Sequence, residues 1–119
     1  MEIDFWEDVS GMGKCPVADF IETLPIKTQA KLTKKFESFE KYSLQAMFSS
    51  KLILPLKGYD LYEIQLRIES VAYRFLCDVF GEVCLLYHAF KKKRGDTPGK
   101  EIEIALSRKK LHLDVTDRK

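Results

Sequence analysis

Histidine and cysteine are scarce in this sequence of 119 residues, so the side chains that build metal and redox sites are few. His88 and His112 are the two histidines, and neither lies at metal-ligand spacing from another His or from a Cys. The three cysteines, Cys15, Cys77 and Cys84, are odd in number and form no C-x-x-C pair. We therefore expect no metal and no cofactor, and we interpret the cysteines as reduced thiols of a cytoplasmic protein.

Long apolar runs are also missing. No stretch approaches the roughly 18 consecutive apolar residues that a membrane span needs, so no membrane association is expected. The first eight residues are acidic where a signal peptide would be basic. With 45% hydrophobic and 32% charged residues, the chain is neither disordered nor collagen-like. Its length predicts a single domain over residues 1–119.

The common catalytic motifs are lacking as well. The sequence contains no G-x-S-x-G nucleophile motif and no glycine-rich phosphate loop before a helix. Cys77 and Cys84 lie in apolar segments, where a buried and inert thiol is expected. Nucleophilic catalysis by serine or cysteine is therefore unsupported.

Positive charge is present, and it is gathered at one end of the chain. Residues 91–119 carry ten Lys and Arg against five Asp and Glu, whereas residues 1–90 carry ten against thirteen. Such an asymmetry suggests a polyanionic partner. A solvated terminal helix explains the charge equally well.

Hydrophobic periodicity predicts three helices and four strands. These are a short strand at Ile3 and Phe5, a helix from Pro16 to Pro25, a helix over 27–42, strands over 61–70, 71–80 and 83–90, and a last helix with Thr97 as N-cap and Pro98 at its first position. Residues 43–60 are irregular, and Pro55 argues against a central strand there. The order β-α-α-β-β-β-α predicts an α+β fold: an antiparallel sheet with an N-terminal helical hairpin and a C-terminal helix, packed on one face.

The residues that remain for chemistry are mostly cationic and lie in or next to the three central strands. Arg67 is on the polar face of its strand, while Arg74 and His88 interrupt apolar strands. Lys57 precedes the first of these strands. Four further cations follow the last strand: Lys91, Lys92, Lys93 and Arg94. If the strands are neighbours, these side chains converge on one face.

Such a set suits phosphodiester cleavage in RNA. Arg67 and Arg74 are able to hold a phosphate through forked donors, and His88 is able to move a proton near neutral pH. The 2′-hydroxyl attacks the adjacent phosphorus, the arginines stabilise the added negative charge, and a proton goes to the leaving 5′-oxygen. RNA is favoured over DNA because only RNA carries that internal nucleophile.

Each of these residues also has a structural interpretation. Arg74 can pair with Glu63, Glu69 or Asp78 across the sheet. A single histidine at a strand end is commonly a hydrogen-bonded structural residue, and a lysine-rich loop is commonly a solvated turn. Tyr62, Tyr73 and Tyr87 are expected to be core or edge aromatics rather than platforms for base stacking.

Several blocks of the sequence resemble the phage-related HigB-type toxins of the RelE/ParE superfamily. The blocks cover nearly the whole chain in order: residues 13–25, 61–64 (Leu-Tyr-Glu-Ile), 73–75 (Tyr-Arg-Phe), 88–93 (His-Ala-Phe-Lys-Lys-Lys), 97–105 (Thr-Pro-Gly-Lys-Glu-Ile-Glu-Ile-Ala) and Arg108. The resemblance implies a RelE-like fold and the toxin of a type II toxin–antitoxin pair. It implies a ribosome-dependent mRNA endonuclease that blocks translation, with a helix-turn-helix antitoxin as partner. We expect a monomer when the protein is free, because the sequence has no long apolar edge and no heptad pattern.

The cationic pattern and the resemblance together predict the site residues; the resemblance itself implies Arg74 as a clamp and Lys91–Lys93 as contacts to RNA. Arg67, Arg74, His88 and Lys91 are the predicted catalytic residues, with Arg74 as the transition-state clamp. The predicted contacts to nucleic acid are Lys57, Lys92, Lys93, Arg94 and Arg108.

Two positions depart from the family pattern. Gln65 stands where an Arg is common, and Asp96 stands where a Lys is usual. These departures keep two alternatives open: a ParE-like toxin that inhibits gyrase, and a non-catalytic module or decayed toxin that only binds nucleic acid.

Overall fold

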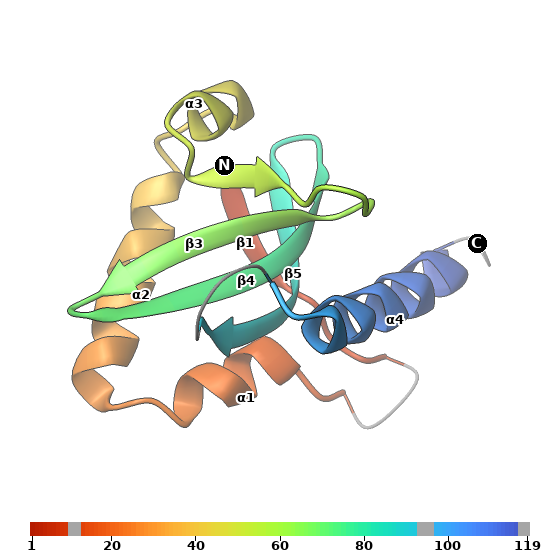
Figure 1. Ribbon diagram of the computed structural model, residues 1–119, viewed down its shortest axis with the longest axis horizontal. Helices are drawn as coiled ribbons and strands as arrows, with labels where there is room; N and C mark the ends of the chain where they lie inside the picture. Colours follow the sequence, from red (N-terminus) through yellow and green to blue (C-terminus); the bar gives the residue numbers. More distant parts are fainter. Residues whose placement is uncertain (10–12, 93–96, 117–119) are drawn as a thin grey trace.

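The computed structural model describes residues 1–9, 13–92 and 97–116 and contains five strands and four helices in that part of the chain (Figure 1). In chain order they are β1 (Glu2–Phe5), α1 (Pro16–Glu22), α2 (Ile26–Phe39), α3 (Leu44–Ser49), β2 (Ile53–Pro55), β3 (Tyr62–Ile68), β4 (Val71–Phe80), β5 (Val83–Lys91) and α4 (Gly99–Thr116). The α+β class is confirmed. No described helix is long and apolar enough to cross a membrane.

The strands form one sheet in the order β1-β5-β4-β3-β2. β3, β4 and β5 make the predicted antiparallel meander. β1, however, pairs with β5 in parallel, so the sheet is mixed and the prediction of a purely antiparallel sheet was wrong. No hairpin turn joins β1 to β5, because residues 6–82 lie between them, and so long a connection allows the two strands to run parallel.

Residues 43–60 are more ordered than predicted. Ser43 caps α3, its hydroxyl accepting a hydrogen bond from the backbone N–H of Ala46 at 3.1 Å. The three-residue strand β2 then pairs with β3 at the edge of the sheet. Pro55 is tolerated there because an edge strand can do without one backbone donor.

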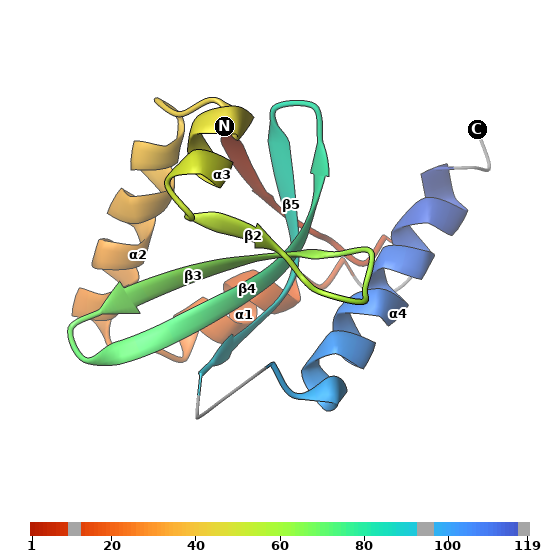
Figure 2. The same ribbon diagram turned by 45° about the horizontal axis from the view of Figure 1, so that its top comes forward.

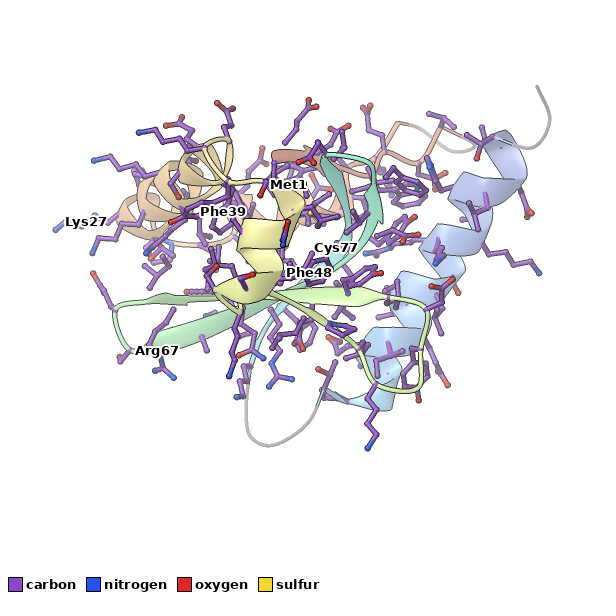
Figure 3. All side chains as sticks on the ribbon, turned by 90° about the horizontal axis from the view of Figure 1, so that it is seen from above. Met1, Lys27, Phe39, Phe48, Arg67 and Cys77 are labelled. Atoms are coloured by element: carbon purple, nitrogen blue, oxygen red, sulfur yellow. The ribbon has the colours of Figure 1, made fainter. Side chains whose placement is uncertain are left out.

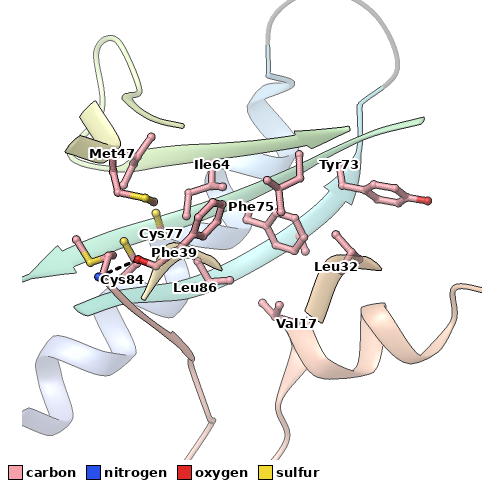
Figure 4. Packing of buried hydrophobic residues seen from close by; sticks show 14 of the residues in the cluster. Val17, Leu32, Phe39, Met47, Ile64, Tyr73, Phe75, Cys77, Cys84 and Leu86 are labelled. Atoms are coloured by element: carbon pink, nitrogen blue, oxygen red, sulfur yellow. Dashed lines mark hydrogen bonds between the residues drawn. The ribbon is translucent and has the colours of Figure 1, made fainter. Parts of the chain in front are cut away.

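The helices cover both faces of the sheet, which corrects the prediction that they pack on one face (Figure 2). On one face α1, α2 and α3 bury Val17, Leu32, Phe39 and Met47 against the strands (Figure 4). On the other face α4 buries Ile102 and Ala105 in a second core, with Leu61, Leu76, Leu85, Tyr87 and Trp6. The second core covers only part of its face.

The cysteines are all free thiols. Cys77 and Cys84 lie on neighbouring strands in the first core (Figure 4), where Cys77 is fully buried. A hydrogen bond with Cys84, together with burial, raises the pKa of the Cys77 thiol well above its usual value. Cys77 is therefore protonated at neutral pH, as expected of a buried, unreactive cysteine.

The last helix begins one residue later than predicted. α4 starts at Gly99, and the carbonyl of Pro98 accepts a hydrogen bond from the N–H of Ile102 at 3.3 Å. Thr97 does not act as the N-cap because its hydroxyl is engaged in side-chain contacts with β3 and β4. α2 likewise departs from its predicted bounds, ending at Phe39 rather than at residue 42.

Candidate functional site

The α4 face of β3, β4 and β5 carries most of the predicted site residues. Side chains alternate between the faces of a strand, and directly opposed residues share a face. The register sets out three rows across the strands: Arg67, Ala72 and Lys92 at the hairpin end, then Gln65, Arg74 and Phe90, then Glu63, Leu76 and His88. The sheet therefore brings Arg67, Arg74, His88 and Lys92 onto one face, as predicted.

Arg74 is the centre of a buried ionic cluster. Its side chain is only 5% exposed, and its Nε lies 3.0 Å from Glu63 Oε1. A terminal nitrogen of Arg74 donates to the Thr97 hydroxyl at 2.5 Å, and this hydroxyl donates to Glu63 Oε1 at 3.2 Å. The structural interpretation of Arg74 is thus confirmed in one of its forms, a pair with Glu63. A charge this deeply buried is tolerated only when it is paired.

An open hollow of about 460 Å³ lies over this cluster. It is lined by Leu56, Lys57, Tyr59, Glu63, Gln65, Arg74, Thr97, Gly99 and Ile102. Lys57 and Arg74 therefore line the same hollow, in agreement with the predicted convergence, and Gln65 lies directly opposite Arg74 in the strand register. The first residue of α4, Gly99, is part of the wall, and the positive end of the helix dipole adds to the attraction for anions.

Tyr59 is a member of this hollow that sequence reasoning missed. It belongs to the loop between β2 and β3, which runs beside α4 (Figure 2). Gly58 has φ +87°, and the N–H of Tyr59 donates to the carbonyl of Leu56 at 3.0 Å, closing a tight turn. The Lys-Gly-Tyr sequence was the available signal, because glycine between polar residues marks a turn. The sequence alone did not predict that this turn and Arg74 would line the same hollow.

His88 lies next to the hollow but under α4. Leu76 pairs with His88 and Cys77 with Leu86, so β5 has one extra residue at this point. This bulge directs both Tyr87 and His88 toward α4. His88 then contacts two residues of that helix: its Nε2 lies 3.1 Å from Glu101 Oε2, and its Nδ1 lies 3.1 Å from a terminal nitrogen of Arg108.

These partners define the protonation state of His88. Arginine only donates hydrogen bonds, so Nδ1 accepts from Arg108, and Nε2 carries the hydrogen that is donated to Glu101. Burial lowers the pKa of His88, with a smaller contribution from the charge of Arg108, and these outweigh the opposing effect of Glu101. The imidazole is therefore neutral at pH 7, and both of its nitrogens are engaged within the protein.

Arg108 is also engaged within the protein. It donates to the backbone carbonyl of Tyr87 at 2.7 Å, and its guanidinium lies 6.0 Å from the ring centre of Trp6. Burial lowers its pKa, although Asp8 and Glu101 counteract the shift. The geometry therefore favours a structural role for Arg108, which ties α4 to β5, over its predicted contact with nucleic acid.

The remaining predicted residues differ in their placement. Arg67 is exposed at the end of the β3–β4 hairpin, where it donates to the carbonyl of Ser70 at 3.4 Å (Figure 3). Lys91 is directly opposite Tyr73, whose side chain is in the first core, so the register places Lys91 on the face away from Arg74. Its predicted grouping with Arg74 is corrected accordingly. Lys93 and Arg94 lie outside the described residues.

The tyrosines and acidic residues considered in the sequence analysis have mainly structural contacts. Tyr73 and Tyr87 are buried and Tyr62 packs against the first core, as expected for core and edge aromatics. The other acids considered as partners of Arg74 pair with lysines: Glu69 with Lys31 at 2.8 Å and Asp78 with Lys109 at 3.0 Å. The described residues contain no group of three or more His, Cys, Asp or Glu that could hold a metal ion.

The arrangement is suited to binding an anion beside a flat ring. A buried guanidinium, an exposed lysine and an exposed tyrosine line one hollow, and two further cations, Arg67 and Lys92, occupy the adjoining row of the sheet. Phosphate groups joined to aromatic bases have this combination of charge and ring surfaces.

Comparison with known proteins places the chain in a family. The family model described as "Phage derived protein Gp49-like (DUF891)" matches residues 19–110. No curated protein matches the chain. The matched residues run from α1 into α4 and include the three central strands, the hollow and His88. Because the match spans more than half of its length, the chain belongs to the Gp49-like family of phage-derived proteins, which is associated with RelE-like toxins.

Proposed function

We propose that this protein is a HigB-type toxin of a type II toxin–antitoxin pair and cleaves mRNA on the ribosome. Membership of the Gp49-like family is compatible with a toxin. The observation that carries the proposal is the hollow that Arg74, Lys57 and the exposed Tyr59 line together. The site of action is the cytoplasm, where translating ribosomes present single-stranded mRNA.

The proposed reaction uses the nucleophile of RNA itself. The 2′-oxygen forms a bond to the adjacent phosphorus and loses its proton, while the bond from phosphorus to the 5′-oxygen breaks and that oxygen gains a proton. The phosphorane-like transition state carries extra negative charge, which the Arg74 guanidinium stabilises from the floor of the hollow. The reaction leaves a cyclic phosphate on one product and a 5′-hydroxyl on the other.

The proton transfers are less well served by His88. A neutral imidazole does not deliver a proton as a general acid, and here Arg108 occupies its accepting nitrogen. We therefore propose Arg74 as the principal catalytic group, and we propose that His88 acts on the site by fixing α4 against β5. Arg67 and Lys92 are proposed as contacts to neighbouring phosphates of the message.

The direct test is to map the 5′ ends of cellular mRNA after brief induction of the parent protein, Arg74→Ala and Arg74→Lys. The lysine variant keeps the charge and loses the fork, so it separates clamp geometry from charge alone. We expect cuts at in-frame codon positions with the parent and none with either Arg74 variant. Lys27→Ala, a change of an exposed residue on α2, is the matched control and should cut like the parent.

Two other outcomes would redirect the proposal. Intact messages with growth arrest would favour the gyrase-inhibiting alternative. Intact messages with normal growth would favour a module that binds nucleic acid without cutting it. The second alternative has an observation in its favour, because Arg74 is already paired with Glu63 and His88 is neutral.

The proposed partner is an antitoxin of the helix-turn-helix class, and the free protein is proposed to be a monomer. An acidic segment of the antitoxin would find complementary charge in the row of Arg67 and Lys92 and at Lys57. Co-purification of the two proteins, and its loss when these three cations are replaced by Ser, would test this assignment.

A further inference from the structure

The loop that carries Tyr59 is held in place on both sides. The buried side chain of Leu61 is only 1% exposed, and the N–H of Leu56 donates to the carbonyl of Leu61 at 2.9 Å. From α4, Lys109 Nζ donates to the carbonyl of Asp60 at 2.6 Å and lies 2.9 Å from its carboxylate. The residue next to Tyr59 is thus fixed by the helix, and the loop is closed at its base.

Despite this fixed backbone, Tyr59 is 48% exposed, and it is one of the residues that line the hollow. A large aromatic side chain on a rigid loop loses little conformational entropy when it meets a flat ligand. Lys57 and Tyr59 flank Gly58, so the loop presents one cation and one aromatic ring to the same space as Arg74. Neither Lys57 nor Tyr59 belongs to the second core.

We infer that Tyr59 is a stacking platform for one base of single-stranded RNA, with Lys57 holding a phosphate of the same strand. The inference rests on the proposed function for the identity of the strand, and it adds a subsite that determines how the strand is seated. Arg74 binds the scissile phosphate at the bottom of the hollow, and the neighbouring base lies on Tyr59 at its rim. Stacking of this kind tolerates any base, because every base has a π-face.

The test measures binding without cleavage. A fluorescently labelled single-stranded oligonucleotide with 2′-O-methyl groups lacks the attacking hydroxyl, and its affinity is followed by anisotropy over a range of salt concentrations. We expect Tyr59→Ala to weaken binding about 10-fold and Tyr59→Phe to stay within about 2-fold of the parent, because phenylalanine keeps the stacking ring. Tyr42→Ala is the matched control, since Tyr42 is 41% exposed but follows α2 on the other side of the sheet.

Salt dependence separates the two members of the subsite. Lys57→Ala should lower the slope of log affinity against log salt by about 0.7, the value for one phosphate contact to a single strand. Tyr59→Ala should leave that slope unchanged, because the ring releases no counterion. A reduced slope in Tyr59→Ala would overturn the assignment of the ring to a base.

An oligonucleotide with abasic positions completes a double-mutant cycle. Removing the base should weaken binding to the parent about as much as Tyr59→Ala does, and should cost Tyr59→Ala nothing further. If the two losses are additive instead, Tyr59 does not stack on a base and the inference fails alone. If the parent binds no single-stranded RNA, the inference fails, and the 5′-end mapping decides separately whether the proposed function fails with it.

Discussion

The α4 face of the sheet has a covered end and an open end, and the polar residues behave differently at each. At the covered end His88 of β5 binds Glu101 and Arg108 of α4. At the open end Arg74, Lys57 and Gln65 border the hollow, and Arg67 and Lys92 occupy the next row. A buried cation is therefore not by itself a site: Arg74 borders an open hollow, whereas Arg108 is engaged by the Tyr87 carbonyl and His88.

Glu63 lies in the same row as His88 and pairs with Arg74. Breaking this pair should have the largest effect on the free energy of unfolding. Glu63→Ala leaves a buried guanidinium without its carboxylate, which costs about 3–5 kcal/mol in such pairs. We expect this loss in the free energy of unfolding measured with urea. Exchanging both members for apolar residues, Glu63→Leu with Arg74→Met, should restore most of it, while cleavage stays lost.

The matched control is Arg67→Ala, which removes an exposed guanidinium from the neighbouring row and should change the free energy of unfolding by less than about 0.5 kcal/mol. A cost below about 1 kcal/mol for Glu63→Ala would contradict the buried pair, since a charge exposed to water needs no partner.

The covered end should make the free energy of unfolding depend on pH through His88. Because the pKa of His88 is lowered in the folded protein, the unfolded chain binds the extra proton first as the pH falls. The stabilisation by neutral His88 is complete above the unfolded value near 6.5 and is lost as the pH falls through the folded value. We expect unfolding free energy to drop between pH 7.5 and 5, by no more than about 1.4 kcal/mol per pH unit for this proton.

His88→Gln isolates that contribution. The variant should lose this part of the pH dependence while keeping the rest, and urea unfolding at several pH values measures the difference. A pH profile identical to that of the parent would mean that His88 does not titrate differently on folding, against the geometry of the covered end.

Gln65→Arg tests whether an added cation at the open end strengthens the binding of RNA. It places a second guanidinium directly opposite Arg74 in the strand register. We expect tighter binding of the 2′-O-methyl oligonucleotide, by a few-fold, and a steeper salt slope by about 0.7. Gln45→Arg on α3 adds the same charge on the other face, and it should change the slope less.

Sequence reasoning was accurate where one physical signal acts alone. The bounds of β4 follow from its enrichment in aromatic and β-branched residues between two turns, and α1 begins at Pro16 as predicted. The sequence did not predict that helices cover both faces of the sheet. The α4 face of β3 carries Glu63 and Gln65, and next to Leu61 this pattern indicates a solvent-exposed face. That α4 would cover part of it depends on long-range packing.

The candidate site shows the same division. Residue types predicted a cationic face, and strand adjacency was enough to bring Arg67, Arg74 and His88 onto it. The bulge at Tyr87 and the position of Tyr59 were beyond reach, because a bulge leaves no mark in the apolar pattern and a loop has no period. The predicted placement of Lys91 beside Arg74 was wrong for a related reason. Lys91 and Lys92 are adjacent in sequence, but successive side chains of a strand point to opposite faces of the sheet.

That alternation supplies the smallest and most specific prediction. Lys91 and Lys92 are adjacent in sequence and equal in charge, so any effect of net charge on RNA binding is the same for both. The register puts Lys92 in the row of Arg67 and Lys91 opposite Tyr73. Lys92→Ala should therefore weaken oligonucleotide binding about 2- to 3-fold and lower the salt slope by about 0.7, whereas Lys91→Ala should leave the slope close to that of the parent. Equal slopes in the two variants would mean that charge alone, and not the face of the sheet, decides how the strand is held.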